Sequence, residues 1–145
     1  FVYNKMSVWY YIHMKISKQQ RIAIRKVAEK NDLQLVLLFG SQVRGGVHAE
    51  SDVDVAILPK KQLSGVRENT IAGNLMDILG DVDLTNLRTA GPLLMKQVFD
   101  NAQVLYEANG IIFDTYYVYA VRRYAEAKPL FDLTAYSIRK FAYGT

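Results

Sequence analysis

Residues 33–58 read LQLVLLFGSQVRGGVHAESDVDVAIL and decide the fold, because two apolar runs flank a polar segment that contains glycine. The first run covers 33–39 and stops at Gly40, which is typical of a short buried strand. The second run covers 52–58 and is followed by Pro59, a residue that interrupts regular structure. The stretch therefore predicts two strands of one sheet.

Helical patterns lie on both sides of this stretch. Ser17-Lys18-Gln19-Gln20 is a capping-box pattern and predicts a helix over about 17–30. Apolar residues recur at helical spacing over 66–79, and Gly80 supplies the stop signal. A further helix is expected to open at Gly91-Pro92, because proline is favoured at the first helical position.

Two more strands and a C-terminal arm complete the predicted chain. Residues 82–87 and 104–106 predict short strands, and from Ile111 the chain is aromatic and helical, with a break expected at Pro129. Strands separated by helices predict an α/β (α+β) domain with a small mixed sheet and flanking helices. We expect three segments in one domain: an N-terminal extension (1–16), a core (17–109) and a C-terminal helical arm (110–145).

Length and composition set limits on the class of protein. The chain has 145 residues, 50% of them hydrophobic, which suits one ordinary domain rather than a disordered chain. It has no cysteine, which excludes disulfides and thiolate zinc sites and fits a cytoplasmic protein. No stretch reaches the eighteen or so apolar residues of a membrane span. The sequence from Met14 reads like a natural start, so we expect residues 1–13 to be an upstream extension.

The net charge of +4 is distributed unevenly. Residues 1–30 carry seven Lys/Arg and one Glu, residues 31–109 carry six Lys/Arg and ten Asp/Glu, and residues 110–145 carry five and three. An acidic centre thus lies between two basic ends. Because no nucleic-acid-binding motif accompanies the basic ends, we do not expect direct nucleic-acid binding. The acidic centre indicates carboxylates that are gathered around a metal.

Asp52 and Asp54 are the central candidate residues. Side chains at i and i+2 of a strand share a face, so these two carboxylates project together, about 7 Å apart at their Cα atoms. Val53 and Val55 are expected to point into the core. A divalent cation relieves the repulsion between paired carboxylates, and Mg²⁺ is the cation that suits oxygen ligands together with substrate phosphates.

A third carboxylate and a phosphate-binding turn complete the predicted site. Asp83 lies in the expected strand 82–87 and would make a two-metal site; Asp81 is an alternative on the same face. Gly40 and Ser41 follow a strand end, where glycine lets a phosphate approach the backbone and the hydroxyl and amides donate hydrogen bonds. Arg44 is the candidate charge partner of the phosphates. Lys60 and Lys61 are alternative phosphate partners, with weaker support from the sequence than Arg44. His13 and His48 are not expected to be metal ligands, because their spacing is not that of a metal site.

The combination of Gly-Ser, a spacer, Asp-x-Asp and a later strand aspartate resembles the DNA polymerase β-like nucleotidyltransferase superfamily. In this chain the motif is GSQVRGGVHAESDVDVAIL followed by VDL, and the resemblance covers roughly residues 17–109. The short chain is most similar to the minimal nucleotidyltransferases (MNT). These are often antitoxins encoded beside a HEPN-domain toxin, which is a helical RNase.

The resemblance implies an antitoxin enzyme that transfers AMP from ATP to a tyrosine of its cognate HEPN toxin and thereby neutralises it. It implies that Asp52 and Asp54 hold two Mg²⁺ ions, and that Asp83 binds the catalytic metal and helps to deprotonate the attacking hydroxyl. It also implies that Gly40 and Ser41 hold the outer phosphates. Two other functions remain open: inhibition of a toxin by contact alone, and nucleotidylation of a small molecule such as an aminoglycoside.

The C-terminal arm also carries a set of tyrosines interleaved with basic residues. The tyrosines are Tyr116, Tyr117, Tyr119, Tyr124, Tyr136 and Tyr143, and the basic residues are Arg122, Arg123, Arg139 and Lys140. Tyrosine and arginine are favoured anchors of protein interfaces, so the arm could dock a partner. It could equally cover the sheet, or stack on the bases of single-stranded RNA.

Overall fold

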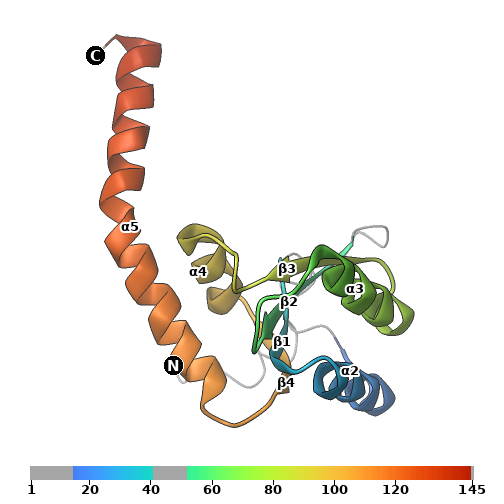
Figure 1. Cartoon of the computed structure of the whole chain (residues 1–145). Helices are drawn as coiled ribbons and strands as arrows, with labels where there is room; N and C mark the ends of the chain where they lie inside the picture. The colour runs from blue at the N-terminus through green and yellow to red at the C-terminus, as the bar shows by residue number, and fades with distance from the viewer. Residues whose placement is uncertain (1–14, 41–51, 145) are drawn as a thin grey trace, which may run out of the picture.

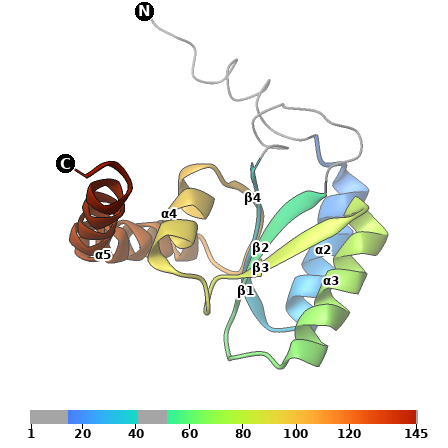
Figure 2. The same cartoon turned by 90° about the horizontal axis from the view of Figure 1, so that it is seen from above.

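A four-stranded sheet lies between two pairs of helices in the computed structural model, which describes residues 15–40 and 52–144 (Figure 1). In chain order the described elements are α2 (Lys18–Lys30), β1 (Leu33–Phe39), β2 (Val53–Pro59), α3 (Gly65–Leu79), β3 (Val82–Asn86), α4 (Pro92–Asp100), β4 (Gln103–Glu107) and α5 (Ile112–Tyr143). Seen from above, α2 and α3 cover one face of the sheet, and α4 and α5 lie on the other side (Figure 2). The predicted α/β fold with flanking helices is confirmed.

The sheet is mixed, with the strand order β3-β2-β1-β4. Strand β1 pairs antiparallel with both β2 and β4, whereas β2 and β3 are parallel. Helix α3 is the crossover that a parallel pair requires. As a consequence, the end of β1 and the beginnings of β2 and β3 meet at one edge of the sheet.

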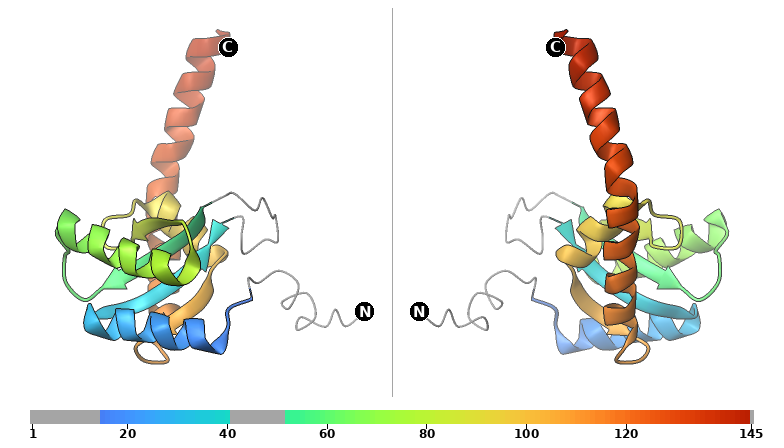
Figure 3. Two further views of the ribbon diagram at one scale, coloured as in Figure 1. Left: turned by 90° about the vertical axis from the view of Figure 1, so that its right-hand side faces the viewer. Right: turned by 90° about the vertical axis from the view of Figure 1, so that its left-hand side faces the viewer.

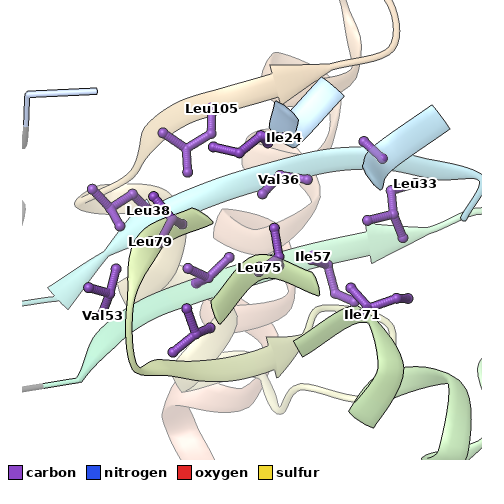
Figure 4. Packing of buried hydrophobic residues seen from close by; sticks show 13 residues of the cluster. Ile24, Leu33, Val36, Leu38, Val53, Ile57, Ile71, Leu75, Leu79 and Leu105 are labelled. Atoms are coloured by element: carbon purple, nitrogen blue, oxygen red, sulfur yellow. The ribbon is translucent and has the colours of Figure 1, made fainter. Parts of the chain in front are cut away.

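Side-chain alternation along the central strands makes two apolar layers. One layer packs under α2 and α3 (Figure 4), and its buried residues are Ile24, Ala28, Leu33, Val36, Leu38, Val53, Val55, Ile57, Ile71, Leu75, Leu79, Val82 and Leu105. The other packs under α4 and α5, and its buried residues are Leu35, Leu37, Ala56, Leu58, Leu87, Met95, Val98, Phe99, Ile112 and Ala120. In β2 the odd positions therefore face α2 and α3, and the even positions face the α4/α5 side.

Local signals determined several element ends. The capping box of α2 is present: the Ser17 Oγ accepts from the Gln20 backbone N–H at 3.1 Å, and the Gln20 Oε1 accepts from the Ser17 N–H at 2.9 Å. Helix α3 ends at Gly80, which has φ +87. Pro59 is the last residue of β2 rather than its stop, and β4 is two residues longer than predicted.

Helix α5 is the clear difference from the sequence prediction, because it runs without interruption through Pro129. The predicted break was wrong. Proline removes one backbone donor and disfavours the helical conformation of the residue before it, but neither effect forbids a helix that bends. Figure 1 shows one long helix that changes direction along its length, and the Lys128–Asp132 ion pair (2.7 Å) spans the proline. Among the described helices, none is long and apolar enough to cross a membrane.

Candidate active site

Asp54 lies at the edge of the sheet where β1 ends and β2 and β3 begin. Cross-strand pairing places it opposite Phe39 of β1 on one side and opposite Asp83 of β3 on the other. The Val53 N–H donates to the Asp81 carbonyl at 2.7 Å, which fixes the start of β3 against β2. Two carboxylates that are far apart in the sequence thus become nearest neighbours on parallel strands, on the face that α4 and α5 share.

Gly40 packs directly against the Asp54 side chain. It has φ +80, a region that residues with a Cβ rarely adopt. A Cβ built on Gly40 would overlap Oδ2 of Asp54 and lie 3.0 Å from its Cγ. The sequence prediction assigned Gly40 to phosphate contact; the structure adds that glycine is required here to leave room for the carboxylate.

The electrostatics of the site centre on Asp54. Its carboxyl is half-buried, whereas Asp52 and Asp83 are exposed. Burial, and then the negative charges of Asp83 and Asp52, raise the pKa of Asp54 above its ordinary value. All three predicted carboxylates are therefore close enough to interact electrostatically, and both burial and the neighbouring charges oppose the ionisation of Asp54.

Two of the predicted site residues, Ser41 and Arg44, lie outside the described residues, as do His13 and His48. Lys60 and Lys61 follow the far end of β2, opposite the end that carries Asp54. Their position argues against the alternative role as phosphate partners at the carboxylates.

A cavity of about 460 Å³ lies at that far end of β2, between α4 and α5. No local sequence pattern joins the residues of its walls, so the cavity was not predictable from the sequence. Arg123 donates to the Ala90 carbonyl at 3.4 Å and lies over the Tyr119 ring, with 5.7 Å from its Cζ to the ring centroid. Arg88 donates to the Lys60 carbonyl at 3.1 Å. Both guanidinium groups thus have partners within the fold, and the cavity is separate from the carboxylates.

The family model for polymerase beta nucleotidyltransferases matches residues 23–110, which is more than half of the chain. The chain belongs to this nucleotidyltransferase family. The matched region contains Gly40 and all three carboxylates.

Known relatives of this nucleotidyltransferase include a protein adenylyltransferase and the antitoxins of toxin–antitoxin structures. Protein adenylyltransferase MntA of Shewanella oneidensis is 39% identical over 75 residues, which are 51% of this chain and 54% of that protein, so the match spans about half of its length. A crystal structure of a toxin–antitoxin with AMP-PNP aligns with TM-score 0.67 and 30% identity over 79% of this chain and 98% of that chain. A structure of a tri-AMPylated Shewanella oneidensis HEPN toxin in complex with MNT antitoxin aligns with TM-score 0.63 and 28% identity, over 81% and 98%.

The carboxylates of this nucleotidyltransferase fit a divalent cation by their chemistry. The donors are oxygen atoms only, and the like charges of Asp52 and Asp83 act on Asp54. Over the described ranges, no three acidic or histidine side chains converge closely enough to form a ready-made metal site.

Replacing Asp54 by asparagine is expected to stabilise the metal-free protein at neutral pH, raising Tm by about 2 °C. Because folding raises the pKa of Asp54, its ionised form destabilises the fold. This destabilisation is absent below the unfolded-state pKa of about 4, where the carboxyl is protonated, and is fully present above the folded-state pKa. Thermal unfolding in the presence of a chelator at pH 3 and pH 7 tests this prediction. The Tm of Asp54→Asn should exceed that of the parent protein only at pH 7.

The matched control is Asp77→Asn, which removes an exposed carboxylate of α3 on the other side of the sheet. It should leave Tm nearly unchanged at both pH values. A lower Tm for Asp54→Asn than for the parent protein at pH 7 would contradict the repulsion argument.

Proposed function

We propose that this chain is an antitoxin that transfers AMP from ATP to a tyrosine hydroxyl of a cognate HEPN toxin. The observation that carries the proposal is the placement of Asp54 beside Asp83 on parallel strands, with Asp52 in electrostatic range and Gly40 against the carboxylate. Family membership supports nucleotidyl transfer. The named relatives support the donor and the acceptor, because they include a protein adenylyltransferase, an AMP-PNP complex and an AMPylated HEPN toxin.

The proposed reaction is an in-line substitution at the α-phosphorus of ATP. The tyrosine oxygen forms a bond to that phosphorus, the bond to the bridging oxygen of the β-phosphate breaks, and pyrophosphate leaves. The hydroxyl proton passes to a carboxylate oxygen of Asp83, which is exposed and can reach an incoming substrate. Gly40 keeps the space beside Asp54 free, and Gly40 and Ser41 are proposed to hold the outer phosphates.

Mg²⁺ is the proposed metal. Asp52 and Asp54 would hold two ions, with Asp83 as a further ligand of one, and the ions would neutralise the triphosphate and the departing pyrophosphate. The carboxylates would also fix the positions of the proposed Mg²⁺ ions, because β2 and β3 hold Asp54 and Asp83 in register.

Intact-mass spectrometry of the cognate HEPN protein that the proposal requires tests the proposal. After incubation with ATP and Mg²⁺, the HEPN protein should gain the mass of one or more AMP units, and peptide mapping should locate them on a tyrosine. A chelator should prevent the adduct. Absence of an adduct on the HEPN protein, in a mixture where the two proteins bind each other, would overturn the proposed activity.

Gly40→Ala is expected to lower the rate of AMP transfer about 100-fold, because displacement of a catalytic group by about 1 Å costs that much. The new Cβ would overlap Oδ2 of Asp54 and push the carboxylate out of place. A radiolabelled-ATP transfer assay at saturating partner measures the effect.

Gly80→Ala is the matched control for backbone strain. Gly80 has φ +87, close to the φ of Gly40, but a Cβ there would meet no atom within 4 Å. Both variants should lose stability, and only Gly40→Ala should lose transfer. Equal loss of transfer in the two variants would assign the effect to strain rather than to Asp54.

A further inference from the structure

The apolar stripe of α5 is continuous along the helix, although only its first half is covered. Its positions follow a heptad spacing of alternating four and three residues: Phe113, Tyr117, Ala120, Tyr124, Ala127, Phe131, Thr134, Ile138 and Phe141. Such spacing keeps one face of a helix turned toward a neighbouring helix. The stripe thus predicts helix-on-helix packing along all of α5.

The first half of the stripe meets this expectation inside the domain. The Phe113 and Tyr117 rings lie 5.3 Å and 5.9 Å from the ring of Phe99 of α4, measured between centroids. Ala120 is fully buried, and the Lys96 Nζ of α4 lies 5.2 Å from the centre of the Tyr124 ring. Helix α4 is therefore the partner of the first half.

The second half of the same stripe extends beyond the domain. Figure 3 shows the C-terminal half of α5 standing away from the sheet and from the other described helices. The exposed fraction rises along it, from 39% at Phe131 to 63% at Ile138 and 94% at Phe141. Consecutive large apolar side chains at helical spacing mark an interaction surface rather than scattered surface residues.

The width of this exposed stripe indicates what kind of partner covers it. Leu130 flanks it on one side and Ala135 and Ala142 on the other, so apolar residues occupy about 140° of the helix at 100° per residue. A simple two-helix seam is narrower; a face this wide is typical of a helix seated between two helices of a bundle. Lys128, Asp132 and Arg139 lie beside this face, next to Ala135, and the exposed side chains of Leu133, Tyr136 and Tyr143 lie on the opposite side.

We propose that the exposed stripe formed by Phe131, Ile138 and Phe141 is the docking surface for an apolar groove between two helices of the HEPN toxin. This inference rests on the proposed function, which names a helical toxin as the partner, and it adds the surface of this chain that binds it. The described solved relatives, whose structures are toxin–antitoxin complexes, are consistent with a stable partner of this class.

The test compares two double variants of equal chemistry on opposite sides of α5. Ile138→Gln with Phe141→Gln alters the stripe, and Tyr136→Gln with Tyr143→Gln alters the opposite side, where the side chains are also exposed. Glutamine supports helices, so circular dichroism should show unchanged helix content. The Kd for the cognate HEPN protein, measured by calorimetry without ATP, should rise about 100-fold for the first variant and less than about threefold for the second.

Several outcomes would overturn the docking proposal. The first is that the parent chain does not bind the HEPN protein, and the second is that both variants bind it equally. The third is that the parent chain self-associates, and that the stripe variant abolishes this self-association but still binds the HEPN protein. Because binding is measured without ATP, the result is independent of transfer: binding without any AMP adduct would overturn the proposed function and leave the docking surface intact. With transfer present, the stripe variant should raise the KM for the HEPN protein and leave kcat unchanged.

Discussion

Asp54→Asn is expected to lower the rate of AMP transfer at least about 10³-fold, equivalent to about 4 kcal/mol of transition-state stabilisation. Asp54 lies on β2 opposite Phe39 of β1, packs against Gly40, and is the carboxylate whose ionisation the charges of Asp83 and Asp52 oppose. Asparagine keeps the shape and removes the charge that a divalent cation needs. The same substitution should stabilise the metal-free protein, so the loss of transfer would not come from unfolding.

Two comparisons make this result specific. Asp83→Asn should lose transfer to a similar extent because Asp83 lies opposite Asp54 in the parallel pair, whereas Asp81→Asn should retain most of it because Asp81 precedes β3. The reverse pattern would make Asp81 the third carboxylate. Neutralisation of the toxin in cells that survives in Asp54→Asn would favour inhibition by contact over inhibition by modification.

The sequence pattern predicted the parts of the site but not their contact. Alternation predicted Asp52 and Asp54 on one face of a strand, a relation that lies within a few residues; in the structure β2 begins at Val53, so Asp52 lies just before the strand. The contact between Asp54 and Asp83 depends on which strands are neighbours and on their register, and neither property is encoded within a short window. The packing of Gly40 against Asp54 is also a tertiary contact, and the glycine alone was compatible with several roles.

Helix α5 shows both the strength and the limit of local signals. Aromatic and apolar spacing predicted a helical arm, and the helix is present. The local rule for Pro129 failed because a long helix with a well-packed first half tolerates the loss of one hydrogen bond. The sequence left open whether the arm covers the sheet or docks a partner. Among the described residues, the first half of α5 covers the core, and the second half of α5 is exposed and available for docking.

Phe99→Ala is expected to lower the free energy of unfolding by about 3–5 kcal/mol. Phe99 is only 2% exposed and lies at the centre of the contact between α4 and α5, with the rings of Phe113 and Tyr117 on it. Its removal would leave a cavity that a sheet on one side and a helix on the other cannot easily close. The Tyr117 hydroxyl also donates to Asp100 at 2.5 Å, so a shift of α5 would lose this hydrogen bond as well.

Urea unfolding followed by circular dichroism measures this loss, with Phe141→Ala as the matched control. Phe141 is on the same stripe of α5 as Phe113 and Tyr117 but is 94% exposed. Its truncation should therefore change the free energy of unfolding by less than about 0.5 kcal/mol. A loss below about 1 kcal/mol in Phe99→Ala would show that α5 does not depend on α4 for its position. Phe99 of α4 packs against the first half of the α5 stripe, and Phe141 lies in its exposed second half, so the contrast separates the two functions of the stripe: the first half holds α5 to the domain, and Phe141 is available to a partner.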